Sequence, residues 1–339
     1  MSVSRSAWER FVADHPSATL FHQPAWIETL CRSYGGHPHY LLLKDTGQDE
    51  RAGLPLVEVH SFFTGRRGVS LPFTDECVPL VHSAEVWQVL LQELITLGRT
   101  RGWRYIEFRG AGDRLGFGKV SLRFYGHDLD LSAGPDACFK LLKSEVRTAI
   151  RKAQRQGVTV RFAHDREAVR AYYRLHCLTR KLHGLPPQPF RFFHFIHEHL
   201  VARGKGQVVL AERGGRYISG AMFLEHEDTV YYKFGASDPA YRSFRSANLV
   251  MWEAIKRYAQ LGFRRLDFGR TSLDNEGLCR FKRGWGSRER TVAYGRLALP
   301  DAAWSADADR TVGWHTTVFR SLPIPVLRLL GAILYPHMA

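Results

Sequence analysis

A short stretch of sequence occurs twice in this chain, and the repetition constrains the fold more than any other feature. Residues 102–108 read Gly-Trp-Arg-Tyr-Ile-Glu-Phe, and residues 262–268 read Gly-Phe-Arg-Arg-Leu-Asp-Phe. Glycine, an aromatic residue, arginine, an aliphatic residue, an acid and phenylalanine recur at matching positions. Each copy follows a segment with helical periodicity and has the composition of a central strand, so we expect a duplicated helix-to-strand unit.

The order of predicted elements around the two copies supports the duplication, because a short match alone can arise by chance in such a turn. In both halves two helices precede three strands, a helix and two final strands. The first half has expected helices at 6–14, 24–34 and 84–100 and strands at 40–44, 54–62, 68–73, 105–108 and 125–131. The second half has expected helices at 166–182, 190–203 and 246–261 and strands at 207–212, 219–225, 229–234, 265–268 and 291–297.

This element order is that of the GNAT acetyltransferase fold. The predicted class is therefore α/β, with tandem GNAT-like domains, each a mixed twisted sheet flanked by helices. A length of 339 residues suits two domains of about 150 residues. We place a first domain at 1–135, a basic linking helix at 136–157, a second domain with the expected active site at 158–300, and an amphipathic tail at 301–339.

The charge of the chain favours an anionic partner. Lys and Arg number 48 against 33 acidic residues, a formal net charge of +15. RNA, a pyrophosphate-bearing donor and an anionic membrane surface all qualify, and a merely basic protein is the alternative. The predicted linking helix concentrates this charge and is either a solvated basic face or a groove wall that follows phosphates. Its cations are Lys140, Lys143, Arg147, Arg151, Lys152 and Arg155.

Several simple signals favour a cytoplasmic location. No apolar signal-peptide core follows Met1, and no run of about 18 uncharged apolar residues predicts a spanning helix. The apolar tail from Trp314 to Tyr335, interrupted by Arg320 and Arg328, is expected either to lie on the inner membrane surface or to pack back on the protein. The cysteines form no CxxC pair, which argues against a zinc knuckle or a disulfide framework; they are Cys31, Cys77, Cys138, Cys177 and Cys279.

Four stretches carry a family resemblance: FHQPAWIETL at 21–30, SLPFTDECVP at 70–79, TRKLHGLPPQP at 179–189 and GRTSLDNEGLCRFKRGWG at 269–286. They resemble the FemAB-like proteins, in particular the branch found with bacterial exopolysaccharide and PEP-CTERM systems. Members of the wider FemABX family have two GNAT-like domains and move an amino acid from aminoacyl-tRNA to the amino group of a peptidoglycan precursor. The resemblance implies an acyltransferase or aminoacyltransferase with no tightly bound cofactor.

The most specific family motif is Phe281-Lys282 followed by Trp285-Gly286. The resemblance implies that Lys282 places a cation near the reacting ester carbonyl. Aminolysis of an ester builds negative charge on the carbonyl oxygen, which a fixed ammonium offsets. The alternative is a surface lysine on a short helix.

Other candidates are weighed against ordinary structural roles. Arg270 follows a predicted strand at its C-terminal end, where α/β ligands bind, or pairs with a nearby acid. Asp75 either orients or deprotonates an incoming amine or stabilises a turn.

A second group of candidates lies on the predicted second domain. Arg180, Lys181 and His183 precede a Pro-Pro turn and suit a pyrophosphate or carboxylate, or else a solvated turn. Tyr232 and Lys233 either face the donor cleft or pack in a half-buried sheet.

The place of the GNAT pyrophosphate loop, Gln/Arg-x-x-Gly-x-Gly/Ala, holds Arg242-Ser243-Phe244-Arg245-Ser246-Ala247-Asn248. The first arginine fits, but the glycines that let backbone approach phosphate are missing, which disfavours acyl-CoA. Arg242, Arg245 and the N–H groups around Ser246 and Asn248 are still expected to hold an anion.

No metal site is predicted. His194, His197 and His199 do not share one helical face, and no HExxH pattern occurs. Nucleophile elbow, Walker and GxGxxG motifs are also absent, which favours direct transfer.

Three functions compete. The first is aminoacyl or acyl transfer to an amine of a cell-envelope precursor, with aminoacyl-tRNA or a related donor. The second is acyl-CoA-dependent N-acylation of an exopolysaccharide sugar. The third is a non-catalytic module that binds RNA or membrane lipid through its basic face.

Overall fold

Both copies of the repeated sequence form a helix end followed by a strand. Helix α3 (Ala84–Thr100) leads through Gly102 into β5 (Tyr105–Arg109), and α8 (Ser246–Gln260) leads through Gly262 into β11 (Arg265–Ser272). The two glycines have φ angles of +67° and +85°, the left-handed conformation in which helices commonly end. The computed structural model describes residues 2–44, 50–62, 64–110, 119–306 and 315–338.

The chain divides into two units whose boundaries differ from the predicted ones. Unit 1 comprises Met1–Phe124, Thr291–Arg310 and Ile333–Ala339, and unit 2 comprises Tyr125–Arg290 and Thr311–Ala332. The chain thus enters unit 2 before the predicted boundary at 135, and residues 291–300 return to unit 1. The predicted tail at 301–339 is divided between the units, and its residues 307–314, including Trp314, lie outside the described residues.

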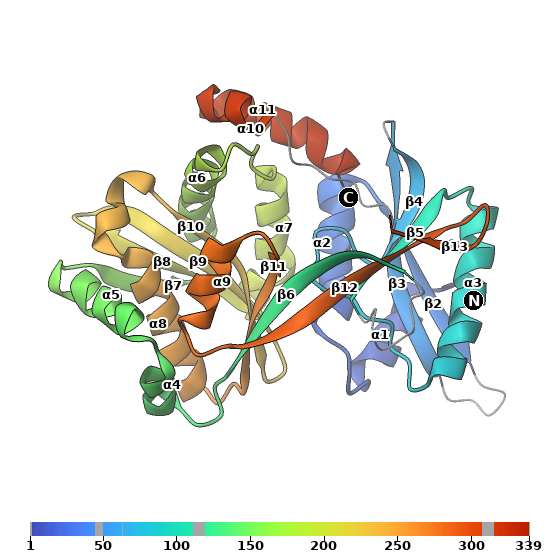
Figure 1. Ribbon diagram of the computed structural model, residues 1–339, viewed down its shortest axis with the longest axis horizontal. Helices are drawn as coiled ribbons and strands as arrows, with labels where there is room; N and C mark the ends of the chain where they lie inside the picture. The colour runs from blue at the N-terminus through green and yellow to red at the C-terminus, as the bar shows by residue number, and fades with distance from the viewer. Residues whose placement is uncertain (1, 45–49, 63, 111–118, 307–314, 339) are drawn as a thin grey trace. The chain divides into compact units, whose positions relative to one another are not determined.

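Unit 1 is a mixed sheet covered by helices (Figure 1). Its strands follow the order β1-β2-β3-β4-β5-β12, antiparallel except for the parallel pair β4/β5. The remaining strands of this order are β1 (Ser2–Val3), β2 (His37–Lys44), β3 (Glu50–Ser61), β4 (Gly65–Val69) and β12 (Arg288–Ala298). Strand β13 (Ala303–Ser305) pairs with β12, and the other helices are α1 (Arg5–Ala13), η1 (Leu20–His22) and α2 (Pro24–Tyr34).

Unit 2 repeats this plan. Its strands follow the order β11-β10-β9-β8-β7, again with one parallel pair, β10/β11. The strands not yet named are β6 (Val120–Asp130), which enters unit 2 at Tyr125, β7 (Thr159–Ala163), β8 (Gly206–Arg213), β9 (Arg216–His226) and β10 (Thr229–Ser237). The α/β class with two GNAT-like halves is confirmed.

The core of unit 2 lies on both faces of its sheet. Ala221 and Phe223 of β9 pack with α8 and with α5 (Ser144–Arg155), whereas Gly220 faces Tyr172 of α6 (Arg166–Leu182). Successive residues of a strand point to opposite faces, so α8 and α6 cover opposite sides of the sheet. Helix α7 (Phe190–His199) and η2 (Val201–Arg203) divide the predicted helix 190–203.

The predicted single linking helix is wrong. Two helices, α4 (Pro135–Leu141) and α5, stand in its place, separated by extended backbone at Leu142 and Lys143. Leu142 is buried in the core, and the Lys143 N–H donates to the Gly284 carbonyl at 3.0 Å. These two tertiary interactions interrupt the helical periodicity that the sequence shows.

The parallel pair of unit 2 is short, and this creates room for a site. Thr229–Tyr231 of β10 pair with Arg265–Asp267 of β11, but β10 stays paired with β9 as far as Ser237. A register shift between Tyr232 and Phe234 marks a β-bulge at Lys233. Beyond Tyr231, β10 and β11 therefore separate.

Glu58 of β3 is a buried carboxylate of unit 1. It accepts hydrogen bonds from Arg101 Nε at 2.8 Å and Trp103 Nε1 at 2.9 Å. Burial alone would raise the pKa of Glu58, but the hydrogen bonds from Arg101 and Trp103 and the charge of Arg101 outweigh it. The pKa of Glu58 falls to about 2.

This lowered pKa predicts an acid-sensitive contribution to stability. A folded pKa below the unfolded one means that the contribution is complete above the unfolded pKa and is lost as the pH falls toward 2. We expect the unfolding free energy of the wild type to fall more steeply below about pH 5 than that of Glu58→Gln. Denaturant titrations that follow Trp fluorescence test this, and parallel pH profiles would contradict it.

Candidate functional site

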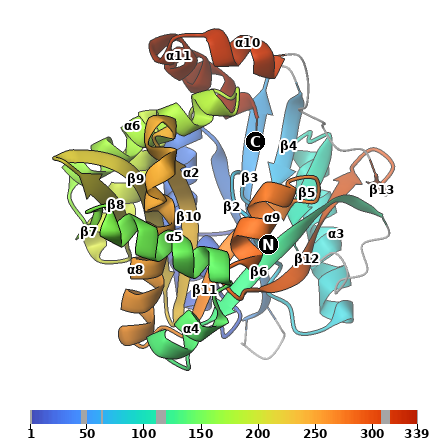
Figure 2. The ribbon, with the colours of Figure 1, turned by 60° about the vertical axis from the view of Figure 1, so that its left-hand side comes forward.

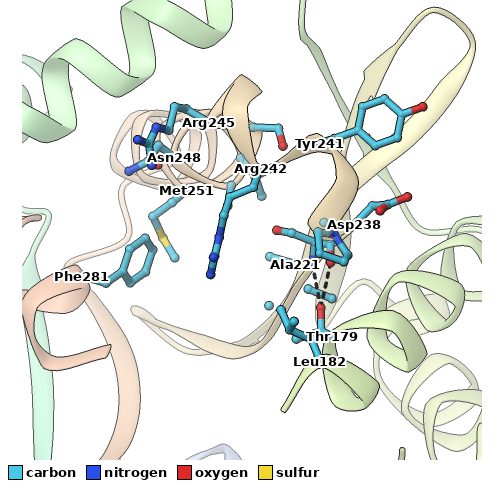
Figure 3. Close-up of a pocket in the computed structure, with 18 of the residues that line it drawn as sticks. Thr179, Leu182, Ala221, Asp238, Tyr241, Arg242, Arg245, Asn248, Met251 and Phe281 are labelled. Atoms are coloured by element: carbon cyan, nitrogen blue, oxygen red, sulfur yellow. Dashed lines mark hydrogen bonds between the residues drawn. The ribbon is translucent and has the colours of Figure 1, made fainter. Parts of the chain in front are cut away.

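A cavity of about 350 Å³ opens in unit 2 beside the part of β10 that has left β11 (Figure 3). We call it the β10 cavity. Its walls come from β9, β10, the last turn of α6, the first turns of α8, helix α9 (Glu276–Arg283) and η3 (Pro239–Phe244). Seven predicted site residues line it: His183, Tyr232, Arg242, Arg245, Ser246, Asn248 and Phe281.

Strand β10 gives the cavity a hydroxyl group and a position restricted to glycine. A Cβ atom on Gly235 would lie 1.8 Å from Tyr232 Oη, so a side chain there would displace the Tyr232 ring. Burial raises the pKa of Tyr232 to about 12, and its hydroxyl is therefore protonated at neutral pH. Thr179 of α6 holds the end of β10, because its Oγ1 donates to the Ser237 carbonyl and accepts from the Ser237 N–H.

The N-terminus of α8 forms the anion-binding side of the cavity. The first N–H groups of a helix lack intrahelical acceptors and carry the positive end of its dipole. The N-cap residue Arg245 makes no side-chain capping hydrogen bond, the first turn of α8 holds no acidic residue, and Ser246 is buried there. Phosphates and carboxylates bind at such helix ends.

Arg245 stands where the GNAT pyrophosphate loop has its first glycine, and its backbone adopts a conformation that favours glycine. Its φ and ψ are +57° and +25°, the left-handed region that non-glycine residues enter at a cost of roughly 1 kcal/mol. Arg245 thus has a left-handed backbone at the start of α8 although the glycine is missing. CoA is disfavoured less than the missing glycine alone would imply, because Arg245 adds a cation at this helix N-terminus.

Arginines make the mouth of the cavity electropositive. Figure 3 shows Arg242 pointing into the space between Phe281 and Met251 on one side and Thr179 and Leu182 on the other. Burial, followed by the charges of Arg180, Arg320 and Arg242, lowers the pKa of His183. A neutral His183 lies among these cations at neutral pH, so the mouth attracts anions.

Lys282 is not among the residues that line the cavity. Its side chain is 2% exposed, and its ammonium donates to the carbonyl oxygens of Gly269 at 2.7 Å and Arg270 at 3.2 Å. Gly269 has a φ of +69°, which interrupts the alternation of β11 where two consecutive carbonyls meet one ammonium. Lys282 thus binds β11 where that strand separates from β10, while its neighbour Phe281 lines the cavity.

Six other predicted residues also lie outside the cavity lining, five of them in unit 2. Trp285 is fully buried and packs edge-to-face on Phe281. Arg180 Nε donates to the Pro186 carbonyl at 3.3 Å, Lys181 is half-buried beside it on α6, and Lys233 sits at the bulge of β10 over the Phe234 ring. Arg270 is half-buried on β11.

Asp75, the predicted group for the incoming amine, belongs to unit 1. Its carbonyl oxygen accepts from the Tyr294 hydroxyl at 2.7 Å, and its charge helps to raise the pKa of Arg109. The structure therefore assigns Asp75 to a network within unit 1.

Sequence reasoning missed several lining residues. Gly235 and Met251 belong to no recognisable motif, and Thr179, although it begins the stretch 179–189, has no feature that marks it as a site residue. Only the run of small residues Gly235-Ala236-Ser237 at the end of a predicted strand signals a surface that a ligand approaches.

One group of the described residues has metal-ligand atoms close together: His127, Cys279 and Glu289, within 4.8 Å of one another. The Glu289 carboxylate already accepts from His127 Nε2 at 3.1 Å and from Arg283 Nε at 2.8 Å. Burial and then the charge of Lys282 lower the pKa of His127. The two nearby cations oppose a bound metal ion, so we read the group as structural.

The histidines of α7 contact protein groups, and His194 and His199 share the Glu198 carboxylate. His194 lies 3.4 Å from the Glu198 carboxylate, His197 hydrogen-bonds the His164 carbonyl at 3.0 Å, and His199 stacks on Phe195.

Comparisons with known proteins agree with this geometry. Residues 141–283 match the acetyltransferase (GNAT) domain family. A stretch of 83 residues, 23% of this chain, is 35% identical to the lipid II:glycine glycyltransferase of Staphylococcus epidermidis. That stretch spans 20% of the length of the staphylococcal protein.

Two solved structures share the fold. A crystal structure of FemX superimposes with a TM-score of 0.68 at 16% identity, covering 86% of this chain and 96% of that one. A tandem GNAT protein from the clavulanic acid biosynthesis pathway gives a TM-score of 0.55 at 11% identity, covering 88% and 98%.

The left-handed backbone at Arg245 predicts that Arg245→Gly raises stability but lowers the affinity for anions. Arg245→Gly should raise the unfolding free energy by about 1 kcal/mol, because glycine adopts this conformation without strain. The same change should weaken binding of inorganic pyrophosphate several-fold, because a cation is removed. Thermal unfolding and calorimetry measure the two effects, and unchanged pyrophosphate affinity would argue against an anion site here.

The buried ammonium of Lys282 gives a second prediction. Lys282→Met should lower the unfolding free energy by about 3 kcal/mol, because two carbonyl acceptors of β11 lose their donor. Lys282→Arg, which keeps the charge, should recover part of this loss. Denaturant unfolding measures both, and an unchanged midpoint for Lys282→Met would show that the two hydrogen bonds contribute nothing.

Proposed function

We propose that this chain, whose residues 141–283 match the acetyltransferase (GNAT) domain family, is a FemAB-like enzyme that transfers an activated aminoacyl or acyl group to an amine of a cell-envelope precursor. The β10 cavity carries this proposal. It combines a stretch of β10 that, within the described residues, lies beyond the pairing with β11, an apolar wall and a cationic helix end, and an activated acyl donor with a phosphate-bearing carrier uses all three.

The anionic carrier of the donor would bind at the α8 end of the cavity. The first N–H groups of α8, with Arg242 and Arg245, would receive its phosphates. The acyl carbonyl would then lie along β10 beyond Tyr231, where the described residues show no pairing with β11. Backbone N–H groups on that edge can stabilise the oxyanion that forms during aminolysis.

The reaction would be a direct transfer. The acceptor amine attacks the carbonyl carbon, a C–N bond forms, and the bond to the carrier oxygen or sulfur breaks. The proton that the amine loses must reach the leaving atom. Tyr232, protonated at neutral pH, has a hydroxyl within the cavity that can pass this proton on.

Lys282 supports the reaction through β11 in this proposal. Its ammonium fixes the carbonyls of Gly269 and Arg270 where the strands separate, and it keeps Phe281 against the cavity. It is therefore a positioning residue whose charge also makes the region behind the cavity more positive.

The two candidate donors are aminoacyl-tRNA and acyl-CoA. The similarity to lipid II:glycine glycyltransferases favours aminoacyl-tRNA and, as acceptor, the amine of a peptidoglycan precursor. The left-handed backbone at Arg245 supports acyl-CoA as the second candidate. The reaction would take place in the cytoplasm.

Transfer assays with each donor and a soluble peptide amine test the proposal. Arg242→Gln should reduce kcat/KM about tenfold to a hundredfold with the true donor, because one charged hydrogen bond to phosphate is lost. The matched control is Arg166→Gln, an exposed arginine of α6 that does not line the cavity.

The outcome separates the donors. Activity with aminoacyl-tRNA alone assigns the aminoacyltransferase function, and activity with acyl-CoA alone assigns the acyltransferase function. No transfer from either donor, or equal rates for Arg242→Gln and the wild type, would overturn the proposal.

A further inference from the structure

Helix α11 (Ile324–Leu334) is apolar around most of its circumference. Its sequence, IPVLRLLGAIL, contains a single polar residue, Arg328. A helix that is hydrophobic all round is normally buried, either in a protein core or in lipid. The side of α11 that packs on the protein and the side that is exposed therefore have different environments.

One side of α11 packs on unit 2. Leu327 and Gly331 are buried, and a Cβ atom on Gly331 would lie 2.0 Å from the Pro187 carbonyl oxygen. Arg328 adds a cation–π contact 5.4 Å above the Tyr173 ring of α6. This side accounts for the packing of the tail on the protein.

The other side of α11 is exposed within the part of the chain that the structure describes. Val326, Leu329 and Ile333 are 41%, 62% and 54% exposed and follow one another at helical spacing. Pro325 and Ala332, also exposed, extend this surface. We call these five residues the α11 face. A contiguous exposed apolar face of this kind marks an interaction site.

The chemistry of the surroundings favours an anionic lipid surface as the occupant. From His315 to Met338 the sequence contains no Asp or Glu, whereas Arg320 and Arg328 are exposed. Apolar side chains flanked by arginines are the pattern of helices that lie in the headgroup region of a bilayer. Within the described residues no helix has the length and hydropathy needed to cross a bilayer, so α11 would lie along the surface.

The α11 face is connected to the mouth of the β10 cavity through α10 (His315–Ser321). Helices α10 and α11 lie next to α6 in both views (Figures 1 and 2). A Cβ atom on Gly184, just past the end of α6, would meet the Thr316 carbonyl at 2.2 Å. Arg320 of α10 is close enough to help lower the pKa of His183, which lines the cavity.

We propose that the α11 face docks on an anionic bilayer surface and thereby brings the mouth of the β10 cavity to the lipid headgroups. The docking itself is independent of the proposed transfer. Only its consequence, an acceptor amine presented on a lipid, rests on that function.

Vesicle co-sedimentation of the full chain tests the docking. The probes are phosphatidylcholine vesicles with and without phosphatidylglycerol. Val326→Gln/Leu329→Gln should lower the partition coefficient on the order of tenfold or more, because two apolar side chains no longer enter the interface. The control is Val89→Gln/Leu261→Gln, which replaces a residue of α3 that is 57% exposed and the residue after α8, which is 60% exposed.

A second part of the experiment varies the charge of the protein and the lipid composition of the vesicles. The wild type should prefer vesicles with phosphatidylglycerol, and Arg320→Gln should reduce this preference about fivefold. Transfer to a soluble amine should be the same for the wild type and the α11 double variant, so failure of docking and failure of the proposed function are distinguishable.

Equal sedimentation of the α11 double variant and the wild type would overturn the proposal. A dimer that forms with rising concentration and that the double variant abolishes would also overturn it, because a second copy of the chain would then cover the face.

Discussion

The separation of β10 from β11 is the constraint on which the site depends. Parallel pairing ends at Tyr231, and from there β10 stays with β9 while β11 turns at Gly269. Free backbone carbonyls at such a point cost free energy unless a donor reaches them. The ammonium of Lys282 supplies that donor, and the space left beside β10 becomes the cavity.

The electrostatics of unit 2 follow from this geometry. The separated strands leave the N-terminus of α8 facing the cavity, so its dipole and the side chains of Arg242 and Arg245 act on the same space. The strained backbone of Arg245 fits this account, because strain persists where the surrounding structure determines it and often marks function. Two cations of this basic chain, Arg242 and Arg245, thus lie at one end of the cavity.

The sequence predicted the fold well because the signals were local and repeated. The two seven-residue copies at 102–108 and 262–268 mark two helix ends and two strands. The helices predicted at 84–100 and 166–182 have the observed bounds. The break at Leu142 depends on a contact with Gly284, far along the chain, which periodicity cannot reveal. The family motif identifies Lys282, but it does not show whether the ammonium enters a cavity or binds the carbonyls of a strand. Thr179 joins the site through its hydrogen bonds to Ser237, which a sequence pattern does not reveal. The sequence also shows that glycine is missing at Arg245, but not that Arg245 adopts the left-handed backbone that glycine favours.

A crystal structure with a non-hydrolysable donor would test the central claim most directly. The donor would be an aminoacyl-adenosine with an amide in place of the ester, or a CoA thioether. The account predicts its acyl carbonyl beside β10, between Tyr232 and Phe281, and its phosphate or ribose end at Arg242 and the start of α8. Density for the donor elsewhere in the chain, with the β10 cavity unfilled, would contradict the account.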